Sequence, residues 1–326
     1  MDSIGPSATR RVPKVVIGLP VHNSERFLQE TLESVAAQDH PNLEIIISDD
    51  ASSDGTPDIC HAYARRDARC RVERHAQRMG WIANYNSLLR HSTGDYFLWV
   101  PHDDVYDPSY VGTLVALLEA RPDAVLAYAT TLAIDEHGRV LRRFAGHAAL
   151  HRATTPLQRG LRYLWWTENE KFIPFRGVVR SGAIRAVGGL EPGPWGVYAD
   201  DLWLFRLALL GSFVHEARPL CRKRYYRGSV STLNRYTLRQ RMAYLAAHRA
   251  LARRARLTRR ERAVLLAAIA LRQAGLAAGW MLRRSRRGLD RFLPTDRLEW
   301  YISPAELPRR LRNLARRVRR LGPPAP

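Results

Sequence analysis

Apolar runs and amphipathic segments alternate through the first 130 residues, and this alternation constrains the fold more than any other feature. Predicted strands lie at residues 15–20, 43–48, 70–75, 96–100 and 124–132, and predicted helices at 24–37, 57–66, 80–90 and 108–120. A strand that is followed each time by a helix is typical of a parallel sheet with crossover helices. The chain is therefore predicted to be an α/β protein with a mainly parallel central sheet.

Two of the predicted strands end in adjacent aspartates, Asp49-Asp50 and Asp103-Asp104. The carboxyl ends of parallel strands meet at one edge of a sheet, where the ligands of open α/β folds bind. Paired carboxylates there suit Mg²⁺ or Mn²⁺ and, through the metal, a diphosphate. The alternative is that each pair caps the next helix. Capping explains less well why both pairs fall at strand ends.

Two later segments combine aromatic and acidic residues. Tyr198-Ala199-Asp200-Asp201 precedes a predicted buried helix that ends at Gly211. Asp200 is either the N-cap of this helix or a general base beside a cleft. The aromatic residues at 165–166 and 172–175 either belong to the core, which is the commoner case, or stack on the apolar face of a sugar ring.

Four segments together resemble a known family. Residues 16–23, 48–56, 94–108 and 199–211, in this order, resemble the family 2 inverting glycosyltransferases with the GT-A fold. The most specific parts are the run Asp49 to Thr56 and His102-Asp103-Asp104 after an apolar strand. The resemblance covers about residues 14 to 236. It implies a GT-A nucleotide-binding sandwich, a nucleotide-diphosphate-sugar donor, a divalent metal (Mg²⁺ or Mn²⁺) and inversion at the anomeric carbon.

The resemblance also implies a role for particular residues. Asp104 would be the direct metal ligand, with Asp103 beside the ribose and the metal, and Asp200 would be the catalytic base. The remaining nucleotide-sugar contacts would come from Pro20, His22, Asn23, Glu25, Asp49, Asp50 and Arg224. These roles agree with the chemistry, because a metal offsets the charge that the diphosphate gains as it leaves, and one carboxylate can take the proton of the attacking hydroxyl. Asp201 is adjacent, but neighbouring side chains on a helix point in different directions.

The chain departs from the family pattern in three places. Pro101 stands where the family often has an aspartate, so the predicted metal site depends on Asp103 and Asp104. Arg78-Met79-Gly80 stands where an asparagine often precedes a glycine, and Arg224-Tyr225-Tyr226 lacks the histidine of a late motif. The late motif therefore offers no histidine to a metal, although Tyr226 could still reach a phosphate.

The positive charge is concentrated at the C-terminal end. The net charge is +21, and residues 237–326, with 23 Arg and Lys and 5 acidic residues, carry +18 of it. The sequence predicts a flexible N-terminus (1–13), a GT-A domain (14–236, with a nucleotide-binding half 14–104 and an acceptor half 105–236) and a basic helical extension (237–326). Within the extension, Leu311, Leu314, Val318 and Leu321 form one apolar stripe among arginines. Such a helix suits an anionic membrane surface or packs on the catalytic domain; nucleic acid is not the expected partner, since no base-stacking module accompanies the charge.

The remaining features indicate the compartment. Cys60, Cys70 and Cys221 have no ligand spacing, which is typical of a reducing compartment without disulfides or zinc. Residues 1–14 contain no apolar segment of the kind found in signal peptides, and the apolar run 263–282 is interrupted by Arg272-Gln273. We expect a cytoplasmic protein that is peripheral at the inner face of the cell membrane.

The leading functional hypothesis is a metal-dependent inverting glycosyltransferase that moves a sugar to a glycan or a lipid-linked acceptor, in the synthesis of cell-surface polysaccharide or glycoconjugate. Two alternatives remain: a sugar-nucleotide or membrane-binding scaffold without activity, and a sugar nucleotidyltransferase. The second fits less well, because Pro20 to Glu25 contains neither the glycine nor the lysine of a phosphate-binding loop.

Overall fold

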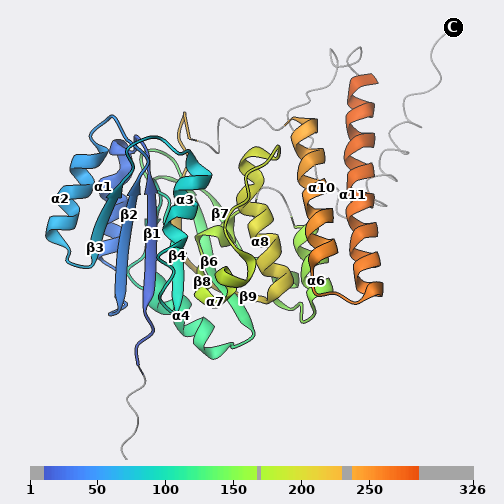
Figure 1. The fold of residues 1–326 in the computed structure, drawn as a ribbon, viewed down its shortest axis with the longest axis horizontal. Helices are drawn as coiled ribbons and strands as arrows, with labels where there is room; N and C mark the ends of the chain where they lie inside the picture. The colour runs from blue at the N-terminus through green and yellow to red at the C-terminus, as the bar shows by residue number, and fades with distance from the viewer. Residues whose placement is uncertain (1–10, 167–169, 230–236, 286–326) are drawn as a thin grey trace, which may run out of the picture.

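The computed structural model describes residues 11–166, 170–229 and 237–285, which form one nine-stranded sheet covered by helices on both faces (Figure 1). The strands are β1 (Val15–Val21), β2 (Leu43–Asp49), β3 (Cys70–Arg74), β4 (Tyr96–Trp99), β5 (Val105–Tyr106), β6 (Ala124–Ile134), β7 (Val140–Phe144), β8 (Val178–Arg180) and β9 (Ser212–Arg224). The helices are α1 (Glu25–Ala36), α2 (Thr56–Arg66), α3 (Trp81–Leu89), α4 (Tyr110–Ala120), α5 (Ala148–His151), α6 (Pro156–Leu164), α7 (Ser181–Val187), α8 (Ala199–Leu210), α10 (Leu238–Arg254) and α11 (Arg259–Ser285), with 3₁₀ turns η1 (Ile173–Arg176) and η2 (Gly196–Tyr198).

The sheet has the order β3-β2-β1-β4-β8-β6-β9-β5, with β7 paired to β6. The first four strands of this order are all parallel, and this half is built from the predicted strand–helix alternation. The second half is mixed, since β8 is antiparallel to both β4 and β6 while β6 and β9 run parallel. The α/β class and the C-terminal helices are thus confirmed, whereas β5, β7, β8 and β9 were not predicted.

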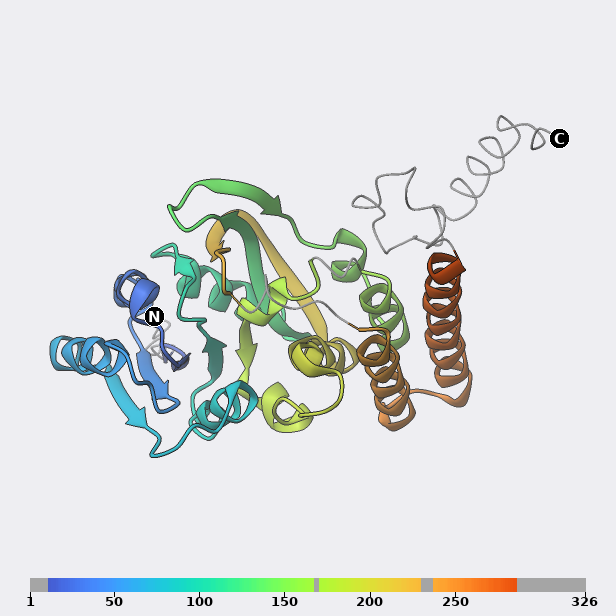
Figure 2. The same cartoon turned by 90° about the horizontal axis from the view of Figure 1, so that it is seen from above.

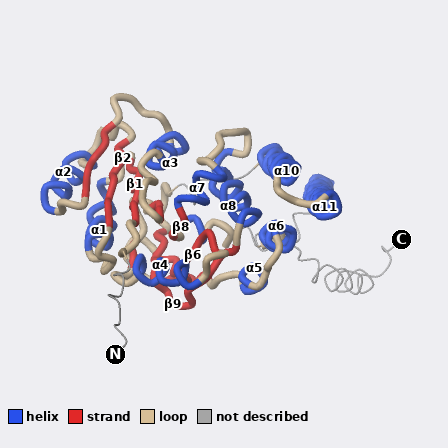
Figure 3. The backbone as a smooth tube through the Cα atoms, turned by 60° about the horizontal axis from the view of Figure 1, so that its bottom comes forward, coloured by secondary structure: helices blue, strands red, loops and turns tan. Residues whose placement is uncertain are grey.

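The alternation of side chains along the strands divides the core between the two faces of the sheet, and Figure 3 shows helices on both sides of the strands. Val15, Ile17 and Leu19 pack on one face with α1, α2 and α4. Val16 and Phe97 point to the other face, where α3, α6 and α8 lie. The first four strands therefore end at a common edge, at which the loops after β1, β2 and β4 come together.

The last two described helices belong to the same core. Helix α10 begins with a capping box formed by Thr237 and Gln240. Leu245 of α10 and Leu265 and Ile269 of α11 are fully buried in the cluster that contains α6 and α8. Figures 1 and 2 show α10 and α11 side by side beyond α8, at the end of the molecule opposite α2. The apolar core therefore continues past residue 236.

The structure describes only part of the predicted extension, up to residue 285. Within the described residues, no helix has a stretch that is both long and apolar enough to cross a membrane. The predicted arginine-rich stripe at 311–321 lies outside the described residues.

Candidate active site

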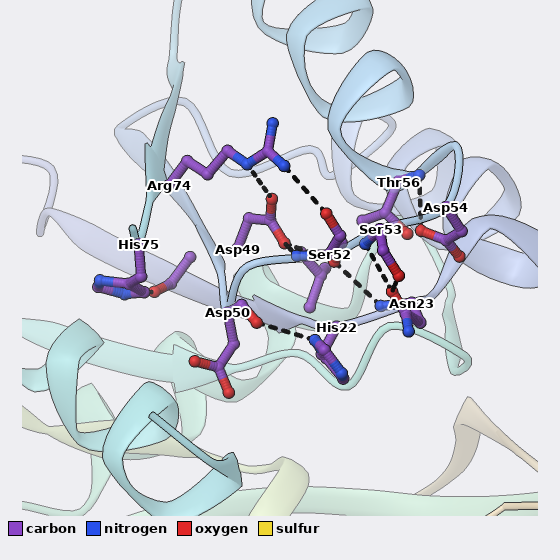
Figure 4. Close-up of polar contacts among 12 residues, drawn as sticks. His22, Asn23, Asp49, Asp50, Ser52, Ser53, Asp54, Thr56, Arg74 and His75 are labelled. Carbon is purple, nitrogen blue, oxygen red and sulfur yellow. Dashed lines mark hydrogen bonds and ion pairs between the residues drawn. The ribbon is translucent and has the colours of Figure 1, made fainter. Parts of the chain in front are cut away.

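The loops that follow β1 and β2 are held together by hydrogen bonds between their side chains and backbones (Figure 4). The carbonyl oxygen Oδ1 of Asn23 accepts a bond from the backbone N–H of Ser53 (2.9 Å), and Nδ1 of His22 lies 2.8 Å from the carbonyl oxygen of Asp50. Oε2 of Glu25 accepts from the backbone N–H of Gly55 (2.7 Å). Pro20 is buried near the end of β1. The four residues predicted to border the nucleotide from this segment therefore lie together at the carboxyl edge of the sheet.

Backbone strain marks the same two loops. Among the described residues, Asn23 (φ 48°) and Ala51 (φ 55°) are the non-glycine residues with a positive φ. Such conformations persist only where the surroundings enforce them, and they are frequent at ligand sites. The strain at both loops therefore supports a binding role for this edge.

Asp49 and Asp50, the first aspartate pair, both hold nearby parts of the chain in place. Asp49 is fully buried; its Oδ1 accepts from the backbone N–H of Ser52 (3.0 Å), and its Oδ2 lies 3.3 Å from Nε of Arg74. Asp50 is 2 % exposed and accepts from the backbone N–H groups of Met79 (2.5 Å) and Gly80 (2.9 Å). Both oxygens of Asp50 thus hold the loop before α3, and the nucleotide contact predicted for this carboxylate stays a prediction.

Asp104, the predicted direct metal ligand, lies in a buried ion pair. Its carboxylate is fully buried and forms an ion pair with Arg176, with 2.5 Å between Oδ2 and Nε. The second oxygen accepts from the backbone N–H of Arg224 (3.1 Å). Burial raises the pKa of Asp104, and the charge of Arg176 offsets part of this effect. Each carboxylate oxygen of Asp104 thus has one protein partner, and the role of direct metal ligand stays a prediction for this residue.

Asp103 is the more accessible member of the second pair. Its side chain is half-buried. The hydroxyl of Tyr226 is hydrogen-bonded to Asp103, and burial together with the negative charge of Asp103 raises the pKa of Tyr226 to about 12. Among the described residues, no three His, Cys, Asp or Glu side chains are grouped as a complete metal site. One carboxylate still fits Mg²⁺ or Mn²⁺ that is also bound by substrate phosphates and water.

Arg224, a predicted nucleotide-sugar contact, is buried and bonded to several parts of the chain. Its Nε donates to the carbonyl oxygen of Asp103 (3.2 Å), Nη1 donates to the carbonyl oxygens of Asp135 and Glu136 (3.3 Å each), and Nη2 bonds to Glu30. The guanidinium lies 4.6 Å from the ring centre of Phe27. Arg224 is 2 % exposed. Four of its five N–H donors therefore join α1 and the β6–β7 turn to the loop that carries Asp103, and a contact with the diphosphate stays a prediction.

Two cations of the site were missed from the sequence. Arg176 in η1 and Lys223 in β9 are both nearly buried beside the second aspartate pair. Burial, together with the charge of Arg176, lowers the pKa of Lys223 to about 8, and its Nζ lies 4.5 Å from the ring centre of Tyr225. A signal for Arg176 was present, because an arginine directly after the apolar run 172–175 is expected to be buried and to need a carboxylate partner.

Asp200 lies in the first turn of α8, and the N-cap position is occupied by Tyr198. The alternative that Asp200 is the N-cap is therefore wrong. Its Oδ1 accepts from the backbone N–H of Asp201 (2.7 Å). Burial and the negative charge of Asp201 raise the pKa of Asp200 to about 7, against the opposing influence of Arg176 and Lys223. A carboxylate with a pKa near neutrality is suited to accept and release a proton.

The acidic residues of the two halves face one site. The pKa of Tyr85 in α3 is raised mainly by burial, and the negative charges of Asp103, Asp104 and Asp200 raise it further. The ring of Tyr85 is stacked on Phe175, with 5.7 Å between ring centres, and Phe175 is stacked on Trp99 at 4.9 Å. Trp166 and Phe175 are 1 % and 6 % exposed, so these two aromatic residues belong to the core and do not offer a face to a sugar.

A surface hollow elsewhere does not coincide with this site. It has a volume of about 740 Å³ and is lined by residues that include Arg11, Gly94, Tyr96 and Arg180. Gly94 and Tyr96 lie at the start of β4, whereas the acidic residues follow its end. The titratable residues with perturbed pKa values are a better guide to the chemistry than the size of this hollow.

Sequence comparison now adds to the geometry. The profile described as glycosyl transferase family 2 matches residues 16–181, which is half of the chain and includes the loops after β1, β2 and β4. The chain belongs to glycosyl transferase family 2.

Relatives within and around this family match part of the chain. A Bacillus subtilis protein that bears the name glycosyltransferase EpsE is 35 % identical over 127 residues, 39 % of this chain and 46 % of that protein. A Rickettsia typhi protein named as a glycosyltransferase is 31 % identical over 130 residues, 40 % of each chain. The chain thus matches less than half the length of these two relatives.

Solved structures share the fold. The S. aureus protein TarS, residues 1–349, in complex with UDP-GlcNAc superposes with a TM-score of 0.62 at 17 % identity, covering 78 % of this chain and 71 % of the other. The mannosyltransferase PcManGT of Pyrobaculum calidifontis, in complex with GDP-Man and Mn²⁺, superposes with a TM-score of 0.54 at 17 % identity, covering 87 % and 82 %. At this identity the likeness shows the GT-A-type fold, in which a family 2 member is expected.

Proposed function

We propose that the protein is an inverting glycosyltransferase that transfers a sugar from a nucleotide-diphosphate sugar to a hydroxyl of a glycan or lipid-linked acceptor, with Asp200 as the catalytic base. The observation that carries this proposal is a carboxylate with a pKa near 7 at the start of α8, within electrostatic reach of the buried cations beside Asp103 and Asp104. UDP-GlcNAc and GDP-Man in two proteins of the same fold support a sugar-nucleotide donor.

The reaction is a single displacement. The acceptor oxygen forms a bond to the anomeric carbon while the bond from that carbon to the diphosphate oxygen breaks, and the hydroxyl proton passes to Asp200. A hydroxyl is a weak nucleophile until it loses this proton, so a carboxylate that is ionised just above neutral pH accelerates the attack. Asp201 is not available for this role, because both its carboxylate oxygens accept bonds from tyrosine hydroxyls.

Asp103 is the residue that we assign to a divalent metal, in place of Asp104. Mg²⁺ or Mn²⁺ bound there would neutralise charge on the leaving diphosphate. The protein's own contribution is to hold Asp103 in place. Arg224 donates to the carbonyl oxygen of Asp103, and Tyr226 is hydrogen-bonded to its side chain.

An anionic membrane surface is the partner that we propose for the basic extension. Exposed arginines gather around the turn between α10 and α11, at residues 253, 254, 256, 259 and 260. On α11, Val264 is 49 % exposed and Leu271 is 65 % exposed. Positive charge beside exposed apolar side chains suits the headgroup region of an anionic membrane, where a lipid-linked acceptor would reside.

A binding screen tests the proposed activity. UDP, GDP and their sugars are added to the full chain with and without Mn²⁺, and the melting temperature is measured. We expect one nucleotide class to raise it with Mn²⁺. Asp103→Asn should abolish the Mn²⁺-dependent part, whereas Asp58→Asn, an exposed carboxylate on α2, should not. Absence of any shift with every nucleotide would contradict the proposal, and binding without turnover would favour the inactive scaffold.

A further inference from the structure

The residue next to the proposed base is fixed by two tyrosines from different parts of the chain. The hydroxyl of Tyr163 in α6 donates to Oδ1 of Asp201 (2.5 Å) and lies 3.2 Å from its backbone carbonyl oxygen. The hydroxyl of Tyr244 in α10 donates to Oδ2 of the same carboxylate. Asp201 is 5 % exposed. Both oxygens of this buried carboxylate are thus bound, which is the condition for keeping a charge inside a protein.

A buried lysine completes this cluster. Lys171 is 2 % exposed, and its Nζ donates to the hydroxyl of Tyr244 (3.3 Å) and to the carbonyl oxygen of Leu164 (3.4 Å). The same Nζ lies 5.3 Å from the ring centre of Tyr163. A lysine is rarely buried without a charged group to balance it, and here that group is Asp201, reached through Tyr244. His248, one turn further along α10, is buried against the ring of Tyr244 at 4.3 Å, and Lys171 and Arg272 act with burial to lower its pKa.

The cluster reaches Asp200 through the backbone. The N–H of Asp201 donates to Oδ1 of Asp200, so the position of residue 201 sets the position of the neighbouring carboxylate. On the other side of Asp200, the ring of Tyr198 stacks on Tyr244 with 4.4 Å between ring centres. Tyr244 therefore contacts the residues on both sides of the short segment that carries Asp200.

We propose that Tyr244 is a positioning residue for Asp200, acting through Asp201, and that α10 is therefore a working part of the catalytic centre rather than only a support for membrane binding. This inference rests on the proposed role of Asp200 as base. It assigns a catalytic contribution to the basic extension, outside the residues 16–181 that carry the family match.

Hydrolysis of the sugar nucleotide tests the inference without knowledge of the acceptor, because water then takes the place of the acceptor hydroxyl and gives its proton to the same base. The donor is the UDP- or GDP-sugar that the binding screen selects, and the released nucleoside diphosphate is measured from pH 5 to 9. Tyr244→Phe should lower the maximal rate by about tenfold or more, since a hydrogen bond to a buried charge is lost. The donor's Kd should stay unchanged, because the nucleotide loops lie on the other half of the sheet.

The pH profile separates a positioning role from a general loss of structure. The negative charge of Asp201 raises the pKa of Asp200, and the positive charges of Arg176 and Lys223 lower it. Asp201→Asn removes the negative charge and should move the acidic limb of the profile to lower pH by about one unit. Lys171→Met should also move the acidic limb of the profile, because Asp201 loses the positive charge that balances it through Tyr244. Tyr128→Phe is the matched control, since it removes a buried hydroxyl that bonds to His151 (2.6 Å) on another element.

The outcomes are distinct. If Tyr244→Phe and Asp201→Asn alter neither the rate nor the midpoint while Asp200→Asn abolishes hydrolysis, the inference is overturned and the proposed function stands. If Tyr244→Phe and Tyr128→Phe slow hydrolysis equally with unchanged midpoints, the cluster is merely structural. If Asp200→Asn hydrolyses the donor at the wild-type rate, the proposed function itself fails.

Discussion

The buried pair Asp104–Arg176 gives the sharpest test of the altered metal assignment. Arg176→Met removes the cation but retains the length and apolar character of the side chain. Asp104 is fully buried and the Arg176 side chain is 8 % exposed, so the carboxylate left behind has no access to water and loses its 2.5 Å contact. Breaking such a pair costs roughly 3–5 kcal/mol of unfolding free energy. For a protein of this size, that corresponds to a melting temperature lower by roughly 10 °C.

The measurement is a double-mutant cycle by scanning calorimetry without added metal. Asp104→Asn alone should also destabilise the protein, because it leaves Arg176 charged and buried. The amide oxygen of the asparagine still accepts the bond from the backbone N–H of Arg224. The double variant Asp104→Asn/Arg176→Met should therefore recover most of the lost stability. Asp103→Asn serves as the matched control and should change the melting temperature little, because Asp103 is half-buried.

A different result would refute this reasoning. If Asp104→Asn leaves the metal-free protein as stable as the wild type and removes the effect of Mn²⁺, then Asp104 is the metal ligand and the ion pair with Arg176 is incidental. Because Asp103 and Asp104 are adjacent, only the combination of stability and metal dependence can separate their roles.

Three further predictions concern Asp50, the C-terminal helices and the stability effect of Asp200. Asp50→Asn should weaken nucleotide binding about tenfold, since a neutral amide holds the backbone of Met79 and Gly80 less strongly than a carboxylate does; unchanged affinity by calorimetric titration would show that this loop does not border the nucleotide. Truncation after residue 236 should yield unfolded protein, because Leu245, Leu265 and Ile269 leave the core; a folded 1–236 fragment would contradict this. Asp200→Asn should raise the melting temperature at pH 8 but not at pH 4. The pKa of Asp200 is about 7 in the folded state and lower in the unfolded state, so the ionised carboxylate destabilises the fold progressively as the pH rises from the unfolded to the folded pKa. The reverse order of effects would show that the pKa is not raised.

The truncation also bears on membrane binding. A flotation test that removes residues 237–326 would remove α10 and α11 from the core along with any membrane-binding surface. Replacing Arg253, Arg254 and Arg256, which are exposed, by serine tests the surface without this loss. We expect flotation with anionic liposomes to fall and to decline further with salt, whereas unaltered flotation would mean that this turn does not face the membrane.

The parallel half of the fold could be predicted because each strand there is a short apolar run followed by an amphipathic helix. The strands of the other half are harder to recognise. Val178–Arg180 is only three residues long, and Ser212–Arg224 mixes apolar and charged residues because part of it is exposed and part lies among buried charges.

The candidate site shows the same limit. The position of Asp49-Asp50 and Asp103-Asp104 at strand ends predicted that these carboxylates would gather at one edge, and the family resemblance added Asp200, but neither showed which partners each would have. Asp50, Asp104 and Arg224 found partners within the protein, namely the loop at 79–80, Arg176 and the Asp103 backbone with Glu30. Such pairings join residues that are far apart in the sequence: Asp104 and Arg176 are separated by 72 positions, and Glu30 and Arg224 by 194. A local sequence pattern does not contain this information. Tyr244 illustrates this most clearly, because nothing in the sequence of a basic helix indicates that one tyrosine reaches the residue beside the base.

The most direct test of the account is the hydrolysis rate of wild-type protein and Asp200→Asn across pH, with donor binding measured on the same samples. The account predicts that the wild-type rate rises with a midpoint near pH 7, where Asp200 becomes ionised. It also predicts that Asp200→Asn binds the donor normally but is slower by roughly 10²–10⁴-fold above pH 7, and that the difference shrinks at lower pH, where Asp200 of the wild type is protonated. A variant that keeps both the wild-type rate and the same midpoint would contradict the assignment of Asp200 as the base.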